Sequence, residues 1–252
     1  MPGDVEFHQL DREVRGRLRT LSKEQAERVG GHLVMVARLI DTDPELAYQH
    51  AQAAVRRAGR VDVVHEAAGL AAYRSGRYAE ALRELRTVRR LNGSAEHLPV
   101  IADAERGLGR PERAIVVGND PDVASLPADS QVELAMVLSG ARLDLGEPEA
   151  AVAVLDSAVV RAAKGVLAVR VAQARATALA ALGRAADAGA ELSRFTQRQL
   201  DEAAGDVEDD DEIVVYDLLD DEEPDTDEGP DDDTALDAAD QPVGDEPGHA
   251  SR

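Results

Sequence analysis

The sequence predicts an all-α chain of about five helical hairpins, with a capping helix at the N-terminus and a disordered acidic tail at the C-terminus. One observation is a turn signal that recurs along residues 28–200. The second is composition: hydrophobic residues make up 44% of the 252 residues, but aromatic residues only 2%. Small aliphatic side chains suit close helix packing, whereas sheets are enriched in β-branched and aromatic residues. The third observation is charge, which divides the chain into a balanced body and an acidic tail.

The first predicted element is a helix from about Leu10 to Thr20. Ser22 follows as the predicted N-cap of the next helix, with Gln25 three residues later, where a capping box requires it. We therefore expect residues 1–27 to form an N-terminal arm and capping helix. Such a segment would cover the open apolar end of a stack of repeats.

The recurring turn signal is a glycine at a nearly constant interval. The anchors are Thr42, Gly76, Gly109, Gly146 and Gly183, at spacings of 34, 33, 37 and 37 residues. Glycine can end a helix in the left-handed conformation, which lets the chain reverse. A fixed period in this range indicates stacked repeats, each of them a helical hairpin.

Two further residue types accompany the anchors. Proline stands two residues after three of them, at the first position of the next helix, where its missing N–H costs nothing: Pro44, Pro111 and Pro148. Alanine stands five residues after all of them: Ala47, Ala81, Ala114, Ala151 and Ala188. We expect these alanines where two helices cross closely, because a larger side chain there would force the helices apart.

The clearest copy of the repeat is HEAAGLAAYRSGRYAEALRELRTVRRLNG, residues 65–93. Its signature positions are Gly69, Tyr73, Gly76, Tyr78, Ala81, Leu85 and Val88. On these residues, the region 28–200 resembles the tetratricopeptide repeat (TPR) superfamily, although the signature Trp is missing from every repeat. The resemblance implies a right-handed α-solenoid and a binding scaffold. More narrowly, the Arg and Ala bias resembles that of cytosolic TPR proteins of actinobacteria, which carries no activity with it.

The third hairpin departs from the pattern. Its second helix begins at Pro111, but Pro121 and Pro127 cannot continue it, so we expect about two turns of helix. A shortened helix would leave a gap in the stack, and the gap would mark a hinge or a specific contact. The alternative is a degenerate repeat without a role.

The resemblance also implies that the first helices of the hairpins line a concave groove. The candidate peptide-binding residues on these helices are His32, Val36, Glu66, Leu70, Tyr73, Arg74, Asp103, Arg106, Met136 and Gln173. The same frame also places on these faces Val29, Leu39, Val63, Glu96, Pro99, Glu133, Gly140, Leu143, Arg170 and Thr177. The family's Lys and Asn clamp for a terminal carboxylate is absent, which disfavours a chaperone-tail ligand. Alternatively, Val36, Leu39 and Leu70 pack between neighbouring helices and bind nothing.

The tail, residues 201–252, holds 23 of the 50 acidic side chains, and the net charge of −22 arises there. Such a composition predicts disorder. A short apolar segment at 213–219 interrupts it: Ile213, Val214, Val215, Tyr216, Leu218 and Leu219. This segment could bind a partner, or it could dock on the Arg-rich stretch from Arg56 to Arg90 of the same chain and inhibit the repeat domain. A third interpretation is a tail that only keeps the protein soluble.

Nothing in the sequence indicates catalysis. The phosphate-binding GxxxxGKS/T, the nucleophile elbow GxSxG and the zinc motif HExxH are absent, and the six histidines are scattered. The chain has no cysteine and no signal peptide or membrane segment that we can identify, so we expect a cytoplasmic protein without cofactors. Scarce aromatics and a polyanionic tail disfavour nucleic acid as a partner. We therefore predict a non-enzymatic adaptor that binds a peptide or protein, or else a regulatory subunit whose tail binds a basic surface.

Overall fold

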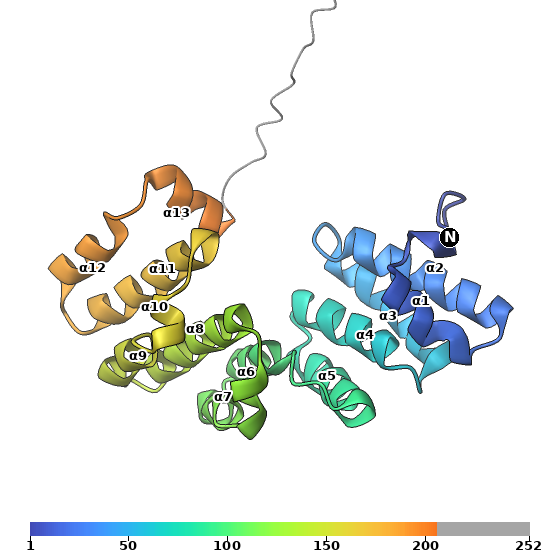
Figure 1. The fold of residues 1–252 in the computed structure, drawn as a ribbon, viewed down its shortest axis with the longest axis horizontal. Coiled ribbons are helices and arrows are strands. Elements are labelled where there is room, and N and C mark those ends of the chain that lie inside the picture. Colours follow the sequence, from blue (N-terminus) through green and yellow to red (C-terminus); the bar gives the residue numbers. More distant parts are fainter. Residues whose placement is uncertain (206–252) are drawn as a thin grey trace, which may run out of the picture. The chain divides into compact units, whose positions relative to one another are not determined.

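The computed structural model describes residues 1–205, and every regular element in this range is a helix (Figure 1). The all-α prediction is therefore confirmed for these residues. The chain divides into a unit Met1–Asp209 and a unit Asp210–Arg252. The predicted disorder of the tail and its segment at 213–219 lie outside the described residues.

The elements follow one another as an N-terminal arm and then a series of hairpins. The arm contains η1 (Phe7–Gln9), α1 (Arg12–Arg17) and η2 (Leu18–Thr20). The hairpins are α2 (Lys23–Leu39) with α3 (Pro44–Ala58), α4 (Asp62–Arg74) with α5 (Tyr78–Asn92), α6 (Leu98–Gly107) with α7 (Pro111–Gly118), α8 (Ala128–Asp144) with α9 (Pro148–Val154), and α11 (Gly165–Ala181) with α12 (Ala185–Leu192). Between and after them lie η3 (Pro121–Ser125), α10 (Ala158–Arg161) and α13 (Gln197–Ala204). Each hairpin packs against the next, α3 on α4, α5 on α6, α7 on α8 and α9 on α11.

Four hairpins turn in the same way. The glycines at 76, 109, 146 and 183 all have φ between 68° and 75°, as predicted. The residue after each glycine donates its N–H to the carbonyl five residues back, for example Arg77 to Ala72 at 2.8 Å and Glu147 to Arg142 at 2.9 Å. This bond satisfies a carbonyl that the helix end would otherwise leave unpaired. The predicted prolines at 44, 111 and 148 each begin a helix.

The five alanines that the sequence places after these turns are buried. Four of them are fully buried, and Ala188 is 8% exposed. Ala47 and Ala51 pack with Val36, Ala68 and Ala71 in one apolar cluster between the first two hairpins. The predicted burial of the small side chains is thus confirmed, and it allows the helix backbones to approach closely.

The N-terminal arm packs on the first hairpin through Leu18, which is fully buried beside Val29, Ala58 and Val64. Ser22 caps α2 as predicted, because its side chain accepts a hydrogen bond of 3.3 Å from the Gln25 N–H. The reciprocal bond from the Gln25 side chain, which would complete a capping box, is not present.

The shortened helix of the third hairpin is confirmed, since α7 ends at Gly118 after eight residues. The expected gap is not found. The chain after α7 returns as η3 and inserts Leu126, 6% exposed, into an apolar cluster with Leu98 and Ala114. Arg89 of α5 forms an ion pair with Asp120, the N-cap residue of η3, with 2.6 Å between its guanidinium and a carboxylate oxygen. This pair links η3 to the second hairpin.

A buried contact between a histidine and a glutamate joins the two helices of the second hairpin. His65 Nδ1 lies 2.7 Å from Glu84 Oε2, and His65 Nε2 lies 3.1 Å from the Gly59 carbonyl. Both ring nitrogens of His65 therefore have a hydrogen-bond partner inside the hairpin. Arg83 binds the second carboxylate oxygen of Glu84 at 2.8 Å, which leaves this buried carboxylate fully paired.

Candidate functional site: a groove on the first helices

An open groove with a volume of about 550 Å³ runs over the first helices of four consecutive hairpins, α4, α6, α8 and α11. Four of the predicted binding residues line it: Tyr73, Asp103, Arg106 and Met136. Of the further residues that the same frame placed on these faces, four also line it, Glu96, Pro99, Glu133 and Arg170. The others, Val29, Leu39, Val63, Gly140, Leu143 and Thr177, do not. Residues up to 97 positions apart in the sequence therefore contribute to one surface.

One wall of the groove is a hydrogen-bonded network that joins three helices. The Tyr73 hydroxyl of α4 donates to Asp103 Oδ2 of α6 at 2.6 Å. Arg106 donates from Nη1 to Asp103 Oδ1 at 3.0 Å and from Nε to Asp144 Oδ2 of α8 at 2.8 Å. The Tyr73 hydroxyl and two nitrogens of the Arg106 guanidinium thus have carboxylate acceptors, which restrict these side chains to one arrangement.

The electrostatics of this wall keep its groups in their donating forms. Burial raises the pKa of Tyr73 above its usual range, and the hydrogen bond to Asp103 raises it further. Burial alone would lower the pKa of Arg106, but Asp144 and Asp103 outweigh it and raise that pKa. At neutral pH, therefore, Tyr73 is a neutral donor and Arg106 is a cation.

A glycine provides the space for the Arg106 guanidinium. Gly140 of α8 faces it so closely that a Cβ there would lie 2.6 Å from Arg106 Cζ. An alanine would displace the far end of a flexible side chain rather than the backbone. Gly140 therefore determines where the guanidinium can lie.

An ion pair between α8 and α11 also lines the groove. Glu133 accepts a hydrogen bond from Arg170 Nη2 at 2.9 Å, and a second bond joins Glu133 Oε1 to Arg170 Nη1. The apolar residues of the lining are Pro99, Val100, Met136 and Val137. The groove thus combines an apolar floor with fixed donors and acceptors along its edges, which suits a peptide with one apolar anchor.

The other predicted binding residues lie elsewhere. Val36 is 4% exposed and belongs to the interface of α2 with α3 and α4, as its alternative interpretation requires. His32 lies beside His50 of α3, with 3.0 Å between their Nδ1 atoms. Arg74 pairs with Asp41 at 3.3 Å. None of these residues lines the groove over α4 to α11.

Three more predicted residues, Glu66, Leu70 and Gln173, lie on the first helices of their hairpins but do not line the groove. Glu66 lies 3.5 Å from Nε2 of His97, and the His97 ring does line the groove. The side-chain amide of Gln173 donates to the Leu200 carbonyl of α13 at 2.9 Å, so this amide group is already bound to α13. Leu70 is partly buried on α4. Sequence reasoning missed His97, Val100, Ser130 and Val137, although Val100 precedes Asp103 on α6 by the three residues that share a helix face.

The Arg-rich stretch from Arg56 to Arg90 is less positive in the fold than in the sequence. Carboxylates from other segments pair with several of its arginines, as in Arg77 with Glu45 at 2.9 Å and Arg86 with the buried Glu105 at 2.5 Å. A charge excess counted in a sequence window therefore overstates the charge available to a partner. The proposed docking of the tail on this stretch stays a prediction.

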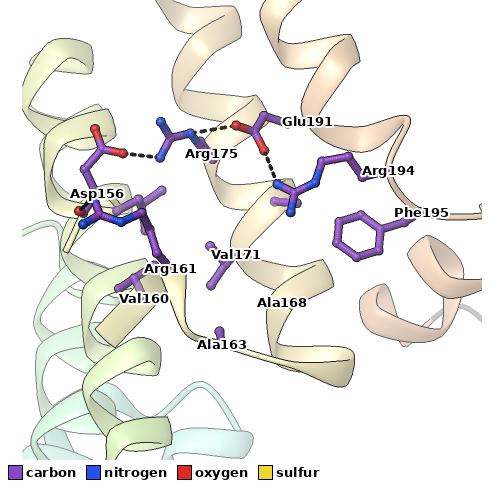
Figure 2. A pocket seen from close by; sticks show the side chains of 12 residues that line it. Asp156, Val160, Arg161, Ala163, Ala168, Val171, Arg175, Glu191, Arg194 and Phe195 are labelled. Atoms are coloured by element: carbon purple, nitrogen blue, oxygen red, sulfur yellow. Dashed lines mark hydrogen bonds and ion pairs between the residues drawn. The ribbon is translucent and has the colours of Figure 1, made fainter. Parts of the chain in front are cut away.

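A second cavity, of about 310 Å³, lies between α10, α11 and α12 (Figure 2). Its carboxylates already have partners: Arg175 lies 2.5 Å from Asp156 and 2.9 Å from Glu191, and Arg194 lies 3.1 Å from Glu191. These charged side chains neutralise one another over an apolar floor. The groove is the stronger candidate because more hairpins contribute to it.

No family model, curated protein or solved structure matches the chain. Among residues 1–205, no helix is long and apolar enough to cross a membrane. In the same range, no three His, Asp or Glu side chains gather closely enough to hold a metal ion.

Proposed function

We propose that residues 28–200 form a TPR-like α-solenoid that binds a peptide or protein segment in the groove over α4, α6, α8 and α11, without chemical turnover. The observation that carries the proposal is the convergence of Tyr73, Asp103, Arg106 and Met136, from three different hairpins, on one groove. Identical turns and buried alanines in successive hairpins support the repeat architecture. A solenoid presents such first-helix faces as a continuous binding surface.

The lining indicates what kind of segment fits. Pro99, Val100 and Met136 offer an apolar floor for one large side chain, and methionine adapts its shape to different ligands. The carboxylates of Asp103 and Glu133 already accept hydrogen bonds from arginine, so they do not repel a ligand as free carboxylates would. We therefore expect a segment with an apolar or aromatic anchor flanked by polar residues, whose backbone bonds the groove edges.

The test begins with selection of peptides from a random display library on the full-length protein. Affinities of the selected peptides are then measured for the wild type, for Met136→Asp and for Val116→Asp. Val116 lies on α7, is 69% exposed and does not line the groove, so it is a matched control. We expect Met136→Asp to lower the affinity by at least about tenfold and Val116→Asp by less than about twofold.

Circular dichroism of both variants shows whether they keep the helical fold. Equal affinities for the wild type and Met136→Asp would contradict binding in the groove. A chain ending at residue 205 separates the adaptor from the tail-driven regulator. The adaptor keeps its affinity without the tail, whereas the regulator loses it.

A further inference from the structure

The N-terminal arm and α2 enclose a cavity of about 470 Å³ that is distant in sequence from the groove. Four cationic side chains line it, Arg12, Arg15, Arg19 and Lys23, together with Phe7, Leu18 and Ala26. No acidic residue is among these lining residues. The cavity is thus a positively charged recess with an apolar floor.

The arginines of this recess lack the partners that most other arginines have. Arg12, Arg15 and Arg19 are three and four residues apart, so they share one face of α1 and η2. Within residues 1–205, no carboxylate oxygen lies within 4.0 Å of any of their guanidinium groups. Arg17, on another face of α1, lies 3.2 Å from Asp62. Lys23 lies 4.0 Å from Glu27, so the recess cations without a carboxylate partner among residues 1–205 are the three arginines.

Arg15 is the least exposed of these three arginines. Its Nε atom is buried from solvent and has no hydrogen-bond partner in the described part of the chain. A buried donor without an acceptor is energetically unfavourable. Like charges around one recess add a repulsive energy, which a bound anion would remove.

We propose that this recess binds a small ligand with a dianionic phosphate monoester on an apolar or aromatic body. Three guanidinium groups can donate to three phosphate oxygens, and a phosphate monoester carries nearly two negative charges at neutral pH. Phe7, Leu18 and Ala26 provide the apolar contact for the body of the ligand. The volume falls in the range of small-molecule sites, and the recess is too local for a nucleic-acid track. This site is separate from the groove and does not rest on the proposed function.

The experiment is calorimetric titration of the full-length protein at low salt with phenyl phosphate, inorganic phosphate and benzoate. We expect phenyl phosphate to bind more tightly than either of the other probes, because it alone offers both the dianion and the ring. Arg15→Gln should weaken the binding of phenyl phosphate by at least about tenfold. Arg28→Gln removes the same charge from α2, where Arg28 pairs with Glu24 at 2.7 Å, and should change the affinity less than about twofold.

Thermal unfolding without ligand separates a binding role of Arg15 from a structural one. If Arg15 serves only to bind a ligand, the Tm of Arg15→Gln should equal or exceed that of the wild type. If Arg15 stabilises the fold, the Tm of Arg15→Gln should be lower. If Arg15→Gln does not fold, the pair of substitutions Arg12→Gln and Arg19→Gln tests the same recess. Equal affinity for phenyl phosphate in the wild type and the recess variants would overturn the proposal. Equal affinity for benzoate and phenyl phosphate would also overturn it.

Discussion

The Tyr73 hydroxyl of α4 donates a hydrogen bond of 2.6 Å to the Asp103 carboxylate of α6, thirty residues further along the chain. This bond links the second hairpin to the third directly across the groove wall. It also means that Tyr73 cannot ionise without placing a phenolate against a carboxylate, and burial opposes ionisation as well. Tyr73 and Asp103 are therefore a single structural unit of the groove.

Tyr73→Phe should remove this link at a small cost. Asp103 keeps its bond to Arg106, so we expect a loss of about 1 kcal/mol in the free energy of unfolding, measured by urea denaturation. The chain has four tyrosines. In a spectrophotometric titration at alkaline pH, the component that ionises last in the wild type should be absent from the variant. A late component that persists in Tyr73→Phe would contradict the raised pKa of this residue.

Gly140→Ala should move the Arg106 guanidinium while leaving the backbone in place. The new methyl group would lie 2.6 Å from Arg106 Cζ, and the flexible side chain can give way. In the wild type, the Arg106 Nε–H group donates to Asp144, and this hydrogen bond slows the exchange of the Nε–H proton with solvent. We expect faster exchange of the Arg106 Nε–H signal in NMR spectra of Gly140→Ala and a stability change below about 1 kcal/mol. The same signal at its wild-type exchange rate would show that Gly140 does not control Arg106.

Two other helix glycines form a matched pair for a test of packing. A Cβ at Gly69 of α4 would lie 2.6 Å from Leu85 Cγ of α5, whereas a Cβ at Gly189 of α12 would meet nothing within 4 Å. Gly69→Ala should therefore destabilise the protein by about 1–3 kcal/mol through overpacking. Gly189→Ala should stabilise it by about 0.5–1 kcal/mol, because alanine favours the helix. Changes of the same sign in thermal unfolding of the two variants would contradict the close contact of α4 and α5.

The turns and the buried alanines could be predicted because the backbone itself demands particular residues. Gly76 and Gly146 adopt a positive φ that other side chains rarely take, and Pro111 and Pro148 begin helices where no N–H is needed. These requirements are local, so they appear in the sequence at regular intervals. The helix order of residues 28–200 follows from them.

Two breaks near the C-terminal end of the described chain escaped prediction. The second helix of the fourth hairpin stops at Val154 and restarts as α10, with Ser157 capping the Val160 N–H at 3.4 Å. Thr196 caps α13 with a full capping box, in which Gln199 returns the bond. In both places the signal was a hydroxyl residue at a helix start, which is weaker than a glycine or a proline.

Ion pairs between hairpins could not be predicted from the sequence. Arg89 reaches Asp120, and Arg106 reaches Asp144, across 31 and 38 residues. Nothing local marks which of many charged residues will meet, because long side chains pair wherever the packing of the helices brings them together. For the same reason, the charge of the Arg56–Arg90 stretch could not be judged before the partner acids were known.

The two histidines of the first hairpin lie in contact with each other. His32 and His50 face each other with 3.0 Å between their Nδ1 atoms, so a hydrogen bond between them requires that at least one ring be neutral. Burial, then the positive charge of His50 and of Arg57, lowers the pKa of His32. Burial also lowers the pKa of His50.

A lowered pKa in the folded state means that the unfolded chain binds more protons, so stability should fall as the pH drops below the ordinary histidine pKa of about 6.5. We expect the wild type to lose stability between pH values of about 7.5 and 5.5, measured by urea denaturation. A variant with both His32→Gln and His50→Gln should lose less over the same range. His8→Gln, at a side chain 70% exposed beside Glu6, should behave as the wild type does. Parallel stability profiles for the double variant and the wild type would contradict the prediction, because the pair would then contribute nothing to the pH dependence.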